Sequence, residues 1–283
     1  MSKFKHLPRA AHGPIKCPYT GANLLGNSYY NKGSAFPAAE RQKFGLHGLL
    51  PPNIQTLDEQ VARAYEQYAS RPGDLAKNTF MASMKAQNQV LFYRLLQTHL
   101  KEMFGVIYTP TEADAIQNYS RLFRKPEGCF LNINDSGLES IEASLENFAP
   151  RDGGEVDYIV VSDGEQILGI GDQGVGAILI SVAKLVITTA CAGIHPSRQL
   201  PVVLDCGTNT SSTTNCTSAS GSRAQQGKNT TTLSIDLCRL RGRSFRMLIS
   251  TLRTLACKTP NASSTNTAGT SRASTTTSRE PGA

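Results

Sequence analysis

The sequence predicts an α/β fold, with a helical N-terminal region, then a small parallel sheet with flanking helices, and finally a disordered tail. Apolar residues recur at helical spacing from residue 56 to residue 124. Between residues 158 and 205, a strand, a glycine-rich turn, an apolar helix and a second strand follow one another. This order is typical of a β-α-β unit, in which the two strands are parallel and the helix packs against them.

The composition divides the chain into three parts. Residues 1–35 are rich in Gly, Pro, Asn and Tyr, and we expect an extended N-terminal arm there. Residues 36–209 form the predicted globular domain. Residues 210–283 form a basic, low-complexity tail rich in Ser and Thr, which has too few apolar residues to offset the entropy of ordering. The whole net charge of +7 comes from this tail, so only the tail suggests nucleic acid as a partner.

The first half of the domain carries clear helix signals. Thr56 and Glu59 have the spacing of a capping box, in which each side chain bonds the other residue's backbone amide. Apolar residues follow at helical spacing until Arg71-Pro72-Gly73. Further helices are expected at residues 74–86, 89–103 and 113–124, with a break at the Tyr-Thr-Pro-Thr sequence of residues 108–111.

The second half carries strand signals. Residues 158–161 and 200–205 are short apolar runs typical of buried strands, and residues 166–171 suggest a return strand or a loop. The helix at 175–192 is apolar and long enough to resemble a membrane span. Lys184 lies in its middle, and an ammonium group at that depth of a bilayer is costly. We therefore expect a buried helix of a soluble domain and no membrane partner.

The stretch from Gly169 to Gly174 matches the pattern GxGxxG at the start of this helix. In dinucleotide-binding proteins such glycines let the backbone approach a pyrophosphate. The preceding strand ends early, at Val161, and Asp172 would put a negative charge among the phosphates. A tight structural turn is the alternative, and no cofactor-binding residue is assigned on this motif.

Two further residues could carry chemistry. Lys184 is either an ordinary lysine whose stem lies along apolar surface, or a buried amine able to act as a general base. Tyr108 is either a half-buried structural tyrosine or a proton donor at the break between two helices. The seven Cys have no CxxC spacing and no His at zinc-ligand spacing, so no metal site is predicted from these residues.

The cellular location is expected to be cytoplasmic. An odd number of Cys and the lack of a secretory signal fit a reducing compartment. A mitochondrial location is the alternative, because the first 39 residues contain basic but no acidic groups. Pro8, Pro14 and Pro18 would interrupt an amphipathic presequence helix.

Five stretches, in order along the chain, resemble the N-terminal domain of malic enzyme. They are FGLHGLLPP (44–52), VIYTPT (106–111), LFRKPEGCFLNI (122–133), SDGEQILGIGDQGVGAILISVAKL (162–185) and LPVVLDCGTN (200–209). The resemblance implies oxidative decarboxylation of L-malate to pyruvate and CO2 with NAD⁺ or NADP⁺ and Mn²⁺ or Mg²⁺. It also implies a homo-oligomer, and a separate NAD(P)-binding Rossmann domain later in the chain.

The resemblance also implies roles for three residues. By its position in the motifs, Lys184 is similar to the general base that takes the C2 hydroxyl proton of malate. Tyr108 is similar to the general acid that protonates C3 of the enol. Gln166 stands where many relatives have an arginine that pairs with a malate carboxylate. The stretch 169–174 would then shape the wall of the active site rather than bind the nucleotide.

After Asn209 the resemblance ends, and the tail reads as an out-of-frame translation. STTTSREPG (274–282), read one base earlier, can give FNDDIQGTG, and STLRTLA (250–256) can give IHFEDFG. Both are motifs of the family, in the expected order. The acidic metal ligands that these motifs would supply are then absent, and we expect no malic enzyme turnover from this chain. A non-catalytic module that associates with full-length subunits is the alternative, while the frame argument leaves a nucleic-acid function little support.

Overall fold

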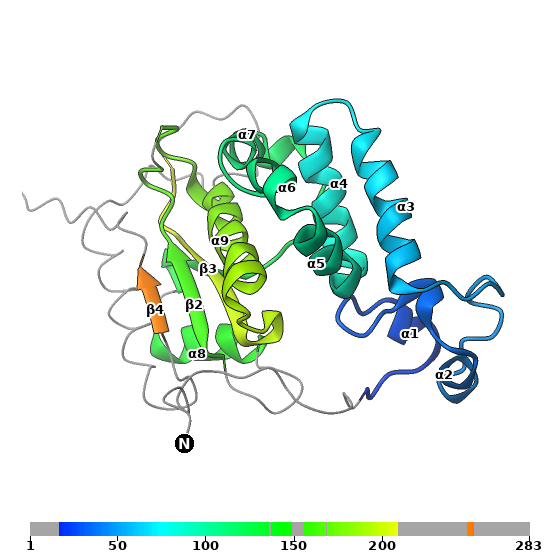
Figure 1. The fold of residues 1–283 in the computed structure, drawn as a ribbon. Helices are drawn as coiled ribbons and strands as arrows, with labels where there is room; N and C mark the ends of the chain where they lie inside the picture. The colour runs from blue at the N-terminus through cyan, green and yellow to red at the C-terminus, as the bar shows by residue number, and fades with distance from the viewer. Residues whose placement is uncertain (1–16, 136, 149–155, 168, 209–247, 252–283) are drawn as a thin grey trace, which may run out of the picture.

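The computed structural model describes residues 17–135, 137–148, 156–167, 169–208 and 248–251. They form a group of helices beside a small sheet, with one long helix between the two (Figure 1). The chain starts with the short elements α1 (Gly21–Leu25), η1 (Gly33–Ala35) and α2 (Ala38–Lys43). Buried Leu24, Phe36 and Leu46 pack together there.

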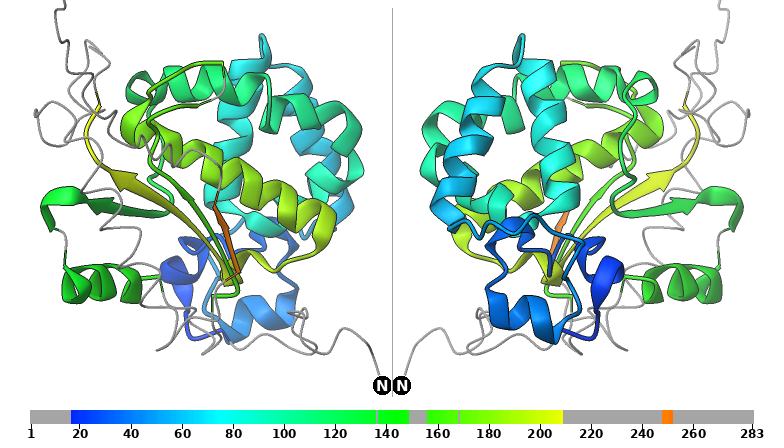
Figure 2. Two further views of the ribbon diagram at one scale, coloured as in Figure 1. Left: turned by 90° about the vertical axis from the view of Figure 1, so that its left-hand side faces the viewer. Right: turned by 90° about the vertical axis from the view of Figure 1, so that its right-hand side faces the viewer.

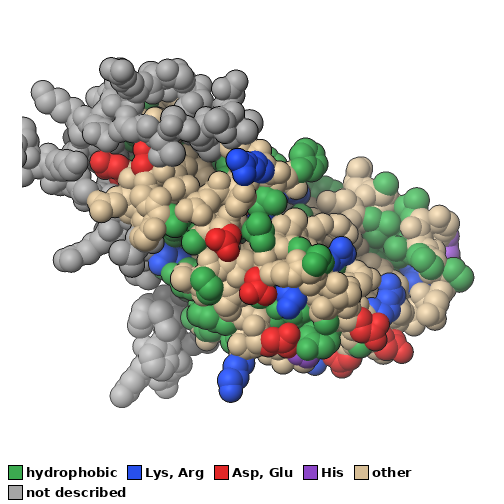
Figure 3. Space-filling model, turned by 90° about the horizontal axis from the view of Figure 1, so that it is seen from above, with side chains coloured by type: hydrophobic (Ala, Val, Ile, Leu, Met, Phe, Trp, Pro, Cys, Tyr) green, Lys and Arg blue, Asp and Glu red, His purple; other side chains and the backbone are tan. Residues whose placement is uncertain are grey.

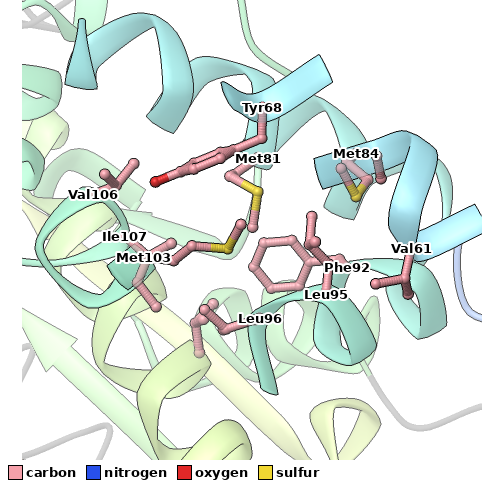
Figure 4. Close-up of a cluster of buried hydrophobic side chains, with 12 residues drawn as sticks. Val61, Tyr68, Met81, Met84, Phe92, Leu95, Leu96, Met103, Val106 and Ile107 are labelled. Atoms are coloured by element: carbon pink, nitrogen blue, oxygen red, sulfur yellow. The ribbon is translucent and has the colours of Figure 1, made fainter. Parts of the chain in front are cut away.

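The helical group consists of α3 (Leu57–Ala69), α4 (Asp74–Gln87), α5 (Gln89–Thr98), α6 (Leu100–Ile107) and α7 (Thr111–Gln117), followed by η2 (Tyr119–Arg121). The predicted capping box is confirmed: Thr56 Oγ1 accepts from the Glu59 amide, and Glu59 accepts from the Thr56 amide. The apolar faces of α3, α4, α5 and α6 meet in one core, in which Phe92 lies among the thioethers of Met81, Met84 and Met103 (Figure 4).

The sheet is parallel throughout, as predicted, and has the strand order β1-β3-β2-β4. The strands are β1 (Cys129–Asn132), β2 (Tyr158–Ser162), β3 (Gln199–Asp205) and β4 (Leu248–Thr251). Helix α8 (Leu138–Glu146), preceded by η3 (Ile133–Asp135), packs on one face of the sheet. Helix α9 (Ile178–Ala192), preceded by η4 (Gly174–Ala177), covers the other face (Figure 2). Between α9 and β3 lies η5 (Pro196–Arg198).

Helix α9 is the apolar segment that resembles a membrane span. Residues Gly174–Ala192 are long and apolar enough to cross a bilayer, with a mean hydropathy of 2.0, and it is the one such helix within the described residues. More than half of this window, 56%, is buried inside the molecule. The helix lies between the sheet and the helical group, so both of its sides contact protein (Figure 1).

Several elements differ from the sequence-based expectation. The helix expected at 89–103 is divided into α5 and α6 at His99, whose ring stacks on Tyr65 of α3 with the centroids 4.0 Å apart. The helix expected at 113–124 starts at Thr111 and ends at Gln117. The possible return strand at 166–171 is a turn closed by a single bridge between Ile167 and Gly171. Strand β1 and helix α8 have no counterpart among the expected elements.

The arm and the tail differ in part from expectation. The described residues of the expected extended arm contain α1 and η1, because apolar Leu24 needs a partner and finds Phe36 and Leu46. The tail expected to be disordered falls outside the described residues except for Leu248–Thr251. These four residues form β4, which pairs in parallel with β2. A sheet edge with unpaired amides and carbonyls readily accepts such a short extended segment.

The surface of the described residues carries charges of both signs. On the face seen from above, acidic and basic side chains are interspersed (Figure 3). Two ion pairs, Lys32 with Glu40 at 2.7 Å and Arg94 with Asp58 at 3.1 Å, join exposed groups of opposite sign. Exposed pairs of this kind contribute little to stability.

Candidate active site

Lys184 lies near the middle of α9. Its neighbours Ala183 and Leu185 are buried, while Lys184 itself is half-buried. Its Nζ donates a hydrogen bond of 3.2 Å to the hydroxyl oxygen of Tyr108. The same Nζ lies 5.6 Å from the centre of the tyrosine ring. The structure therefore brings together the two residues for which the sequence predicts proton chemistry, 76 positions apart in the chain.

Tyr108 follows directly after the last residue of α6 and has an extended backbone, with φ −138° and ψ −153°. A cis peptide bond between Thr109 and Pro110 follows, and α7 starts at Thr111. The Tyr108 ring contacts the edge of Phe104, with centroids 5.9 Å apart. The tyrosine is thus presented from a break between two helices, as the sequence predicts, and its hydroxyl is directed at α9.

Close packing fixes α7 against the start of α9. A Cβ atom on Gly176 of η4 would lie 3.2 Å from the Cβ of Tyr119 and 3.4 Å from the carbonyl oxygen of Ile116. Only a residue without a side chain leaves this contact undisturbed. Since Tyr108 precedes α7 and Lys184 follows η4, this contact restricts how far the two side chains can move apart.

The turn after β2 packs against η4, which leads into the helix that carries Lys184. Asp163 is buried, and burial raises the pKa of its carboxyl group. Its Oδ1 accepts a hydrogen bond from the backbone amide of Glu165. At the same carboxyl edge of the sheet, Asp205 ends β3 and accepts 2.8 Å from Asn132 of β1. Ligands of parallel α/β sheets bind at this edge. Asp163, Asp205 and Asn132 all lie there.

The glycine-rich stretch is not a phosphate cradle in this structure. The amide of Gly171 donates to the carbonyl oxygen of Ile167, and that of Gln173 donates to Gly164. The amide of Gly174 donates to the Asp172 carboxylate at 3.1 Å. The amides that a pyrophosphate would need are therefore bonded within the protein. Of the two interpretations of GxGxxG, the structure favours the tight turn.

Gln166 lies on the turn between β2 and this stretch. Its side chain is exposed, and within the described residues no hydrogen bond joins it to Lys184 or Tyr108. Among the described residues, the structure therefore joins Lys184 to Tyr108 by a hydrogen bond but joins Gln166 to neither of them. Within the described residues, no group of three or more His, Cys, Asp or Glu side chains is clustered closely enough to hold a metal ion.

Two large clefts lie elsewhere on the described surface. One of about 740 Å³ lies between the α1 region and α9, and one of about 840 Å³ lies between α4, α9 and residues 119–127. Both are bordered by Lys85 and Glu127, which form an ion pair of 2.6 Å. Tyr108 and Lys184 line neither cleft, although their chain neighbours Ile107 and Ala183 line the larger one.

Sequence reasoning missed a buried polar network next to Tyr108. Asn78 of α4, Glu112 of α7 and the side chain of Arg124 are joined by hydrogen bonds, with Asn78 and Glu112 both buried. Asn78 and Glu112 are 34 positions apart, so no local pattern could have indicated their contact. The only available signal was a glutamate within the first turn after the YTPT break.

About 70% of the chain is similar to malic enzymes. The sequence profile of the malic enzyme N-terminal domain matches residues 85–235, which is more than half of the chain. The matched range extends beyond Asn209, where the recognisable motifs end.

Three curated relatives illustrate the similarity. The mitochondrial NAD-dependent malic enzyme of Saccharomyces cerevisiae is 53% identical over 199 residues, covering 70% of this chain and 29% of the relative. The NAD-dependent malic enzyme of Schizosaccharomyces pombe is 48% identical over 204 residues, covering 72% and 36%. NAD-dependent malic enzyme 3 of Bacillus subtilis is 47% identical over 203 residues, covering 72% and 35%. The chain thus spans about a third of the length of these relatives, and it belongs to the malic enzyme family.

Proposed function

We propose that this chain carries the malate-side half of an NAD-dependent malic enzyme, in which Lys184 and Tyr108 perform the proton transfers. The observation that supports this proposal is the 3.2 Å contact between Lys184 Nζ and the Tyr108 hydroxyl. An amine and a phenol at this distance can accept a proton from one substrate atom and deliver one to another. The family membership of the chain supports L-malate as the substrate.

The two residues take separate parts in the reaction. Lys184, as the neutral amine, accepts the proton of the C2 hydroxyl of malate. After loss of CO2 from the oxidised acid, Tyr108 donates its phenolic proton to C3 of the enolate, which gives pyruvate. Because Lys184 Nζ can donate to Tyr108, the proton taken from the substrate can pass to the phenolate. The pair is then ready for another substrate molecule without a further proton donor.

Gln166 is proposed to contact one carboxylate of malate. A neutral amide can donate a hydrogen bond to a carboxylate but supplies no positive charge. The exposure of Gln166 leaves its amide accessible. We expect weaker substrate binding than a family member with an arginine at this position would show.

The intact enzyme would use NAD⁺ and a divalent cation, Mn²⁺ or Mg²⁺. The three relatives are named as NAD-dependent, and this favours NAD⁺ over NADP⁺. The described residues hold neither a free phosphate cradle nor a cluster of metal ligands. After residue 209 the chain has the Ser- and Thr-rich tail in place of the acidic motifs that the family resemblance implies. We therefore propose that the 283-residue chain alone does not turn over malate.

A non-catalytic module is the second candidate. Phe123 is fully exposed, and Val90 and Phe104 on the helical group are 48% and 39% exposed. Large apolar side chains that are exposed to solvent favour association with another protein. Its partner would be a full-length malic enzyme subunit, in the cytoplasm or, as for the relative from Saccharomyces cerevisiae, in mitochondria.

An assay of NADH formation from L-malate, NAD⁺ and Mn²⁺ tests the inactivity of the chain. The proposal expects no formation of NADH above the rate without protein, and clear turnover by the purified chain contradicts it. Sequencing the transcript tests the frame. An uninterrupted frame through residue 211 would show that the tail is genuine.

A further inference from the structure

Tyr108 lies at the break between α6 and α7, where its amide donates to the carbonyl oxygen of Phe104 and its own carbonyl oxygen accepts from the Glu112 amide. Helix α6 ends one residue earlier, and α7 starts three residues later. The last carbonyls of one helix and the first amides of the next have no partner within their own helix. The angle between α6 and α7 decides where the Tyr108 hydroxyl points, and Pro110 has no amide hydrogen with which to continue the helix bonding to the Val106 carbonyl oxygen.

The side chain of Asn78 spans this break. Its Nδ2 donates 2.8 Å to the carbonyl oxygen of Val106, near the end of α6. The same Nδ2 donates 3.0 Å to the Glu112 carboxylate, in the first turn of α7. One amide group thus joins the residue two positions before Tyr108 to the residue four positions after it. Asn78 is 5% exposed and Glu112 is 6% exposed, so water does not compete for these bonds.

Arg124 fixes the orientation of this amide. Its Nη2 donates 2.7 Å to Asn78 Oδ1 and 3.3 Å to Thr79 Oγ1. A guanidinium group can only donate, so the oxygen of Asn78 must face Arg124 and its NH2 group must face Val106 and Glu112. Flipping the amide would set donor against donor on one side and acceptor against acceptor on the other.

The charged groups that act on Glu112 are Arg124, Lys85 and Glu127. Burial raises the pKa of the Glu112 carboxyl group to about 7, while Asn78, Arg124 and Lys85 oppose the rise and Glu127 adds to it. Whether ionised or protonated, the carboxyl keeps an oxygen that can accept from Asn78. The link between α4 and α7 therefore does not need a charge on Glu112.

We propose that Asn78 is a positioning residue for Tyr108, whose side-chain amide clamps the end of α6 to the start of α7 and so holds the tyrosine hydroxyl within reach of Lys184. The role rests on the proposed function, in which this hydroxyl donates the proton. Proton transfer requires the donor and acceptor within hydrogen-bond reach, and small displacements of positioned groups are costly to rate. Asn78 touches neither reacting group, and it acts through the backbone on either side of Tyr108.

The reactivity of Lys184 toward an amine-acylating reagent tests this proposal in the full 283-residue chain. Limited acylation with N-acetoxysuccinimide, followed by mass spectrometry of peptides, gives the rate at each lysine. Exposed Lys101 provides the internal reference. The bond to Tyr108 restrains the Lys184 amine, so release of Tyr108 by Asn78→Ala should raise its acylation relative to Lys101 by about fivefold, the factor for a hydrogen bond of about 1 kcal/mol.

A double-mutant comparison separates positioning from general support of the fold. Tyr108→Phe removes the hydroxyl and should raise Lys184 acylation by a similar factor. Adding Asn78→Ala to Tyr108→Phe should then change it no further. Acylation that rises equally in both backgrounds, or that does not change in Asn78→Ala, overturns the proposal.

The second pair of variants covers the case in which Asn78→Ala fails to fold. Glu112→Gln keeps an oxygen for Asn78 and should retain the wild-type acylation rate, whereas Glu112→Ala should raise it. Equal rates in these two variants overturn the proposal. Acylation requires neither malate nor turnover, so these results do not depend on whether the chain acts as a malic enzyme.

Discussion

Gly164 and Gly174 approach each other so closely that a Cβ atom on residue 164 would lie 2.3 Å from the carbonyl oxygen of Gly174. The contact joins the turn after β2 to the start of η4, which leads directly into the helix that carries Lys184. Gly164 also has φ +71°, a backbone conformation that favours glycine. The close packing of this turn against η4 therefore depends on the absence of a side chain at position 164.

Gly164→Ala is expected to destabilise the fold by about 2–4 kcal/mol, because it combines backbone strain with a clash against backbone atoms. Urea unfolding measures the change. Gly169→Ala is a matched control, since Gly169 has φ +87° but no atom of the described residues lies within 4 Å of the place that its Cβ would take. The control should lose only about 1 kcal/mol, the cost of the backbone conformation alone. Equal losses in the two variants would refute the role of the close contact.

Arg41 organises the loop that contains the FGLHGLLPP stretch. It is 6% exposed, and its guanidinium group donates to the carbonyl oxygens of Phe36, Pro51, Ser34 and Asn53 at 2.6–3.1 Å. Lysine cannot reproduce this fork of donors. Arg41→Lys should therefore lower the free energy of unfolding by about 2–3 kcal/mol, since buried carbonyls lose their partners.

The exposed Arg63 serves as the control for this variant, and Arg63→Lys should change the free energy of unfolding by less than about 0.5 kcal/mol. Urea unfolding of both variants measures this free energy. A loss in Arg41→Lys no larger than that in Arg63→Lys would show that the loop does not depend on the guanidinium group.

Glu112 should make stability depend on pH. Its pKa is raised from 4.5 to about 7 in the folded chain, so the folded state binds a proton more tightly than the unfolded state. This contribution to stability is fully present below about pH 4.5 and is lost as the pH rises through 7. The loss amounts to about 3 kcal/mol at most.

Glu112→Gln removes the titration while keeping an oxygen for Asn78. The variant should be more stable than the wild type at about pH 8, and this advantage should vanish toward about pH 5. Thermal or urea unfolding across this range measures it. An advantage that is the same at both pH values would mean that Glu112 does not titrate with a raised pKa.

Local patterns predict the elements whose signals lie within a few residues. The capping box at Thr56, the apolar helix around Lys184 and the strand ending at Asp205 all follow from neighbours in sequence. Strand β1 has only four residues and alternates between buried and open positions. Its identity comes from pairing with residues Val202–Asp205, which are 73 positions away in the chain. A short strand of this kind cannot be recognised without its partner.

The candidate site is predictable only in part for the same reason. Lys184 and Tyr108 each stand out locally, one as a lysine in an apolar helix and the other as a tyrosine before a helix break. The network of Asn78, Glu112 and Arg124 is built entirely from long-range contacts between polar residues of common types. The division of one expected helix at His99 likewise depends on a ring stacked from another helix, Tyr65 of α3.

The most direct test is the turnover number for L-malate of a restored enzyme, in which the chain continues after residue 210 in the reading frame proposed here, compared with its Lys184→Met and Tyr108→Phe variants. The account predicts NADH formation by the restored enzyme and none by the 283-residue chain. It also predicts a loss of about 10²–10⁴-fold in each variant, the range for removal of a general acid or base. Turnover that stays within about twofold of the restored enzyme in either variant would contradict the assignment of Lys184 and Tyr108.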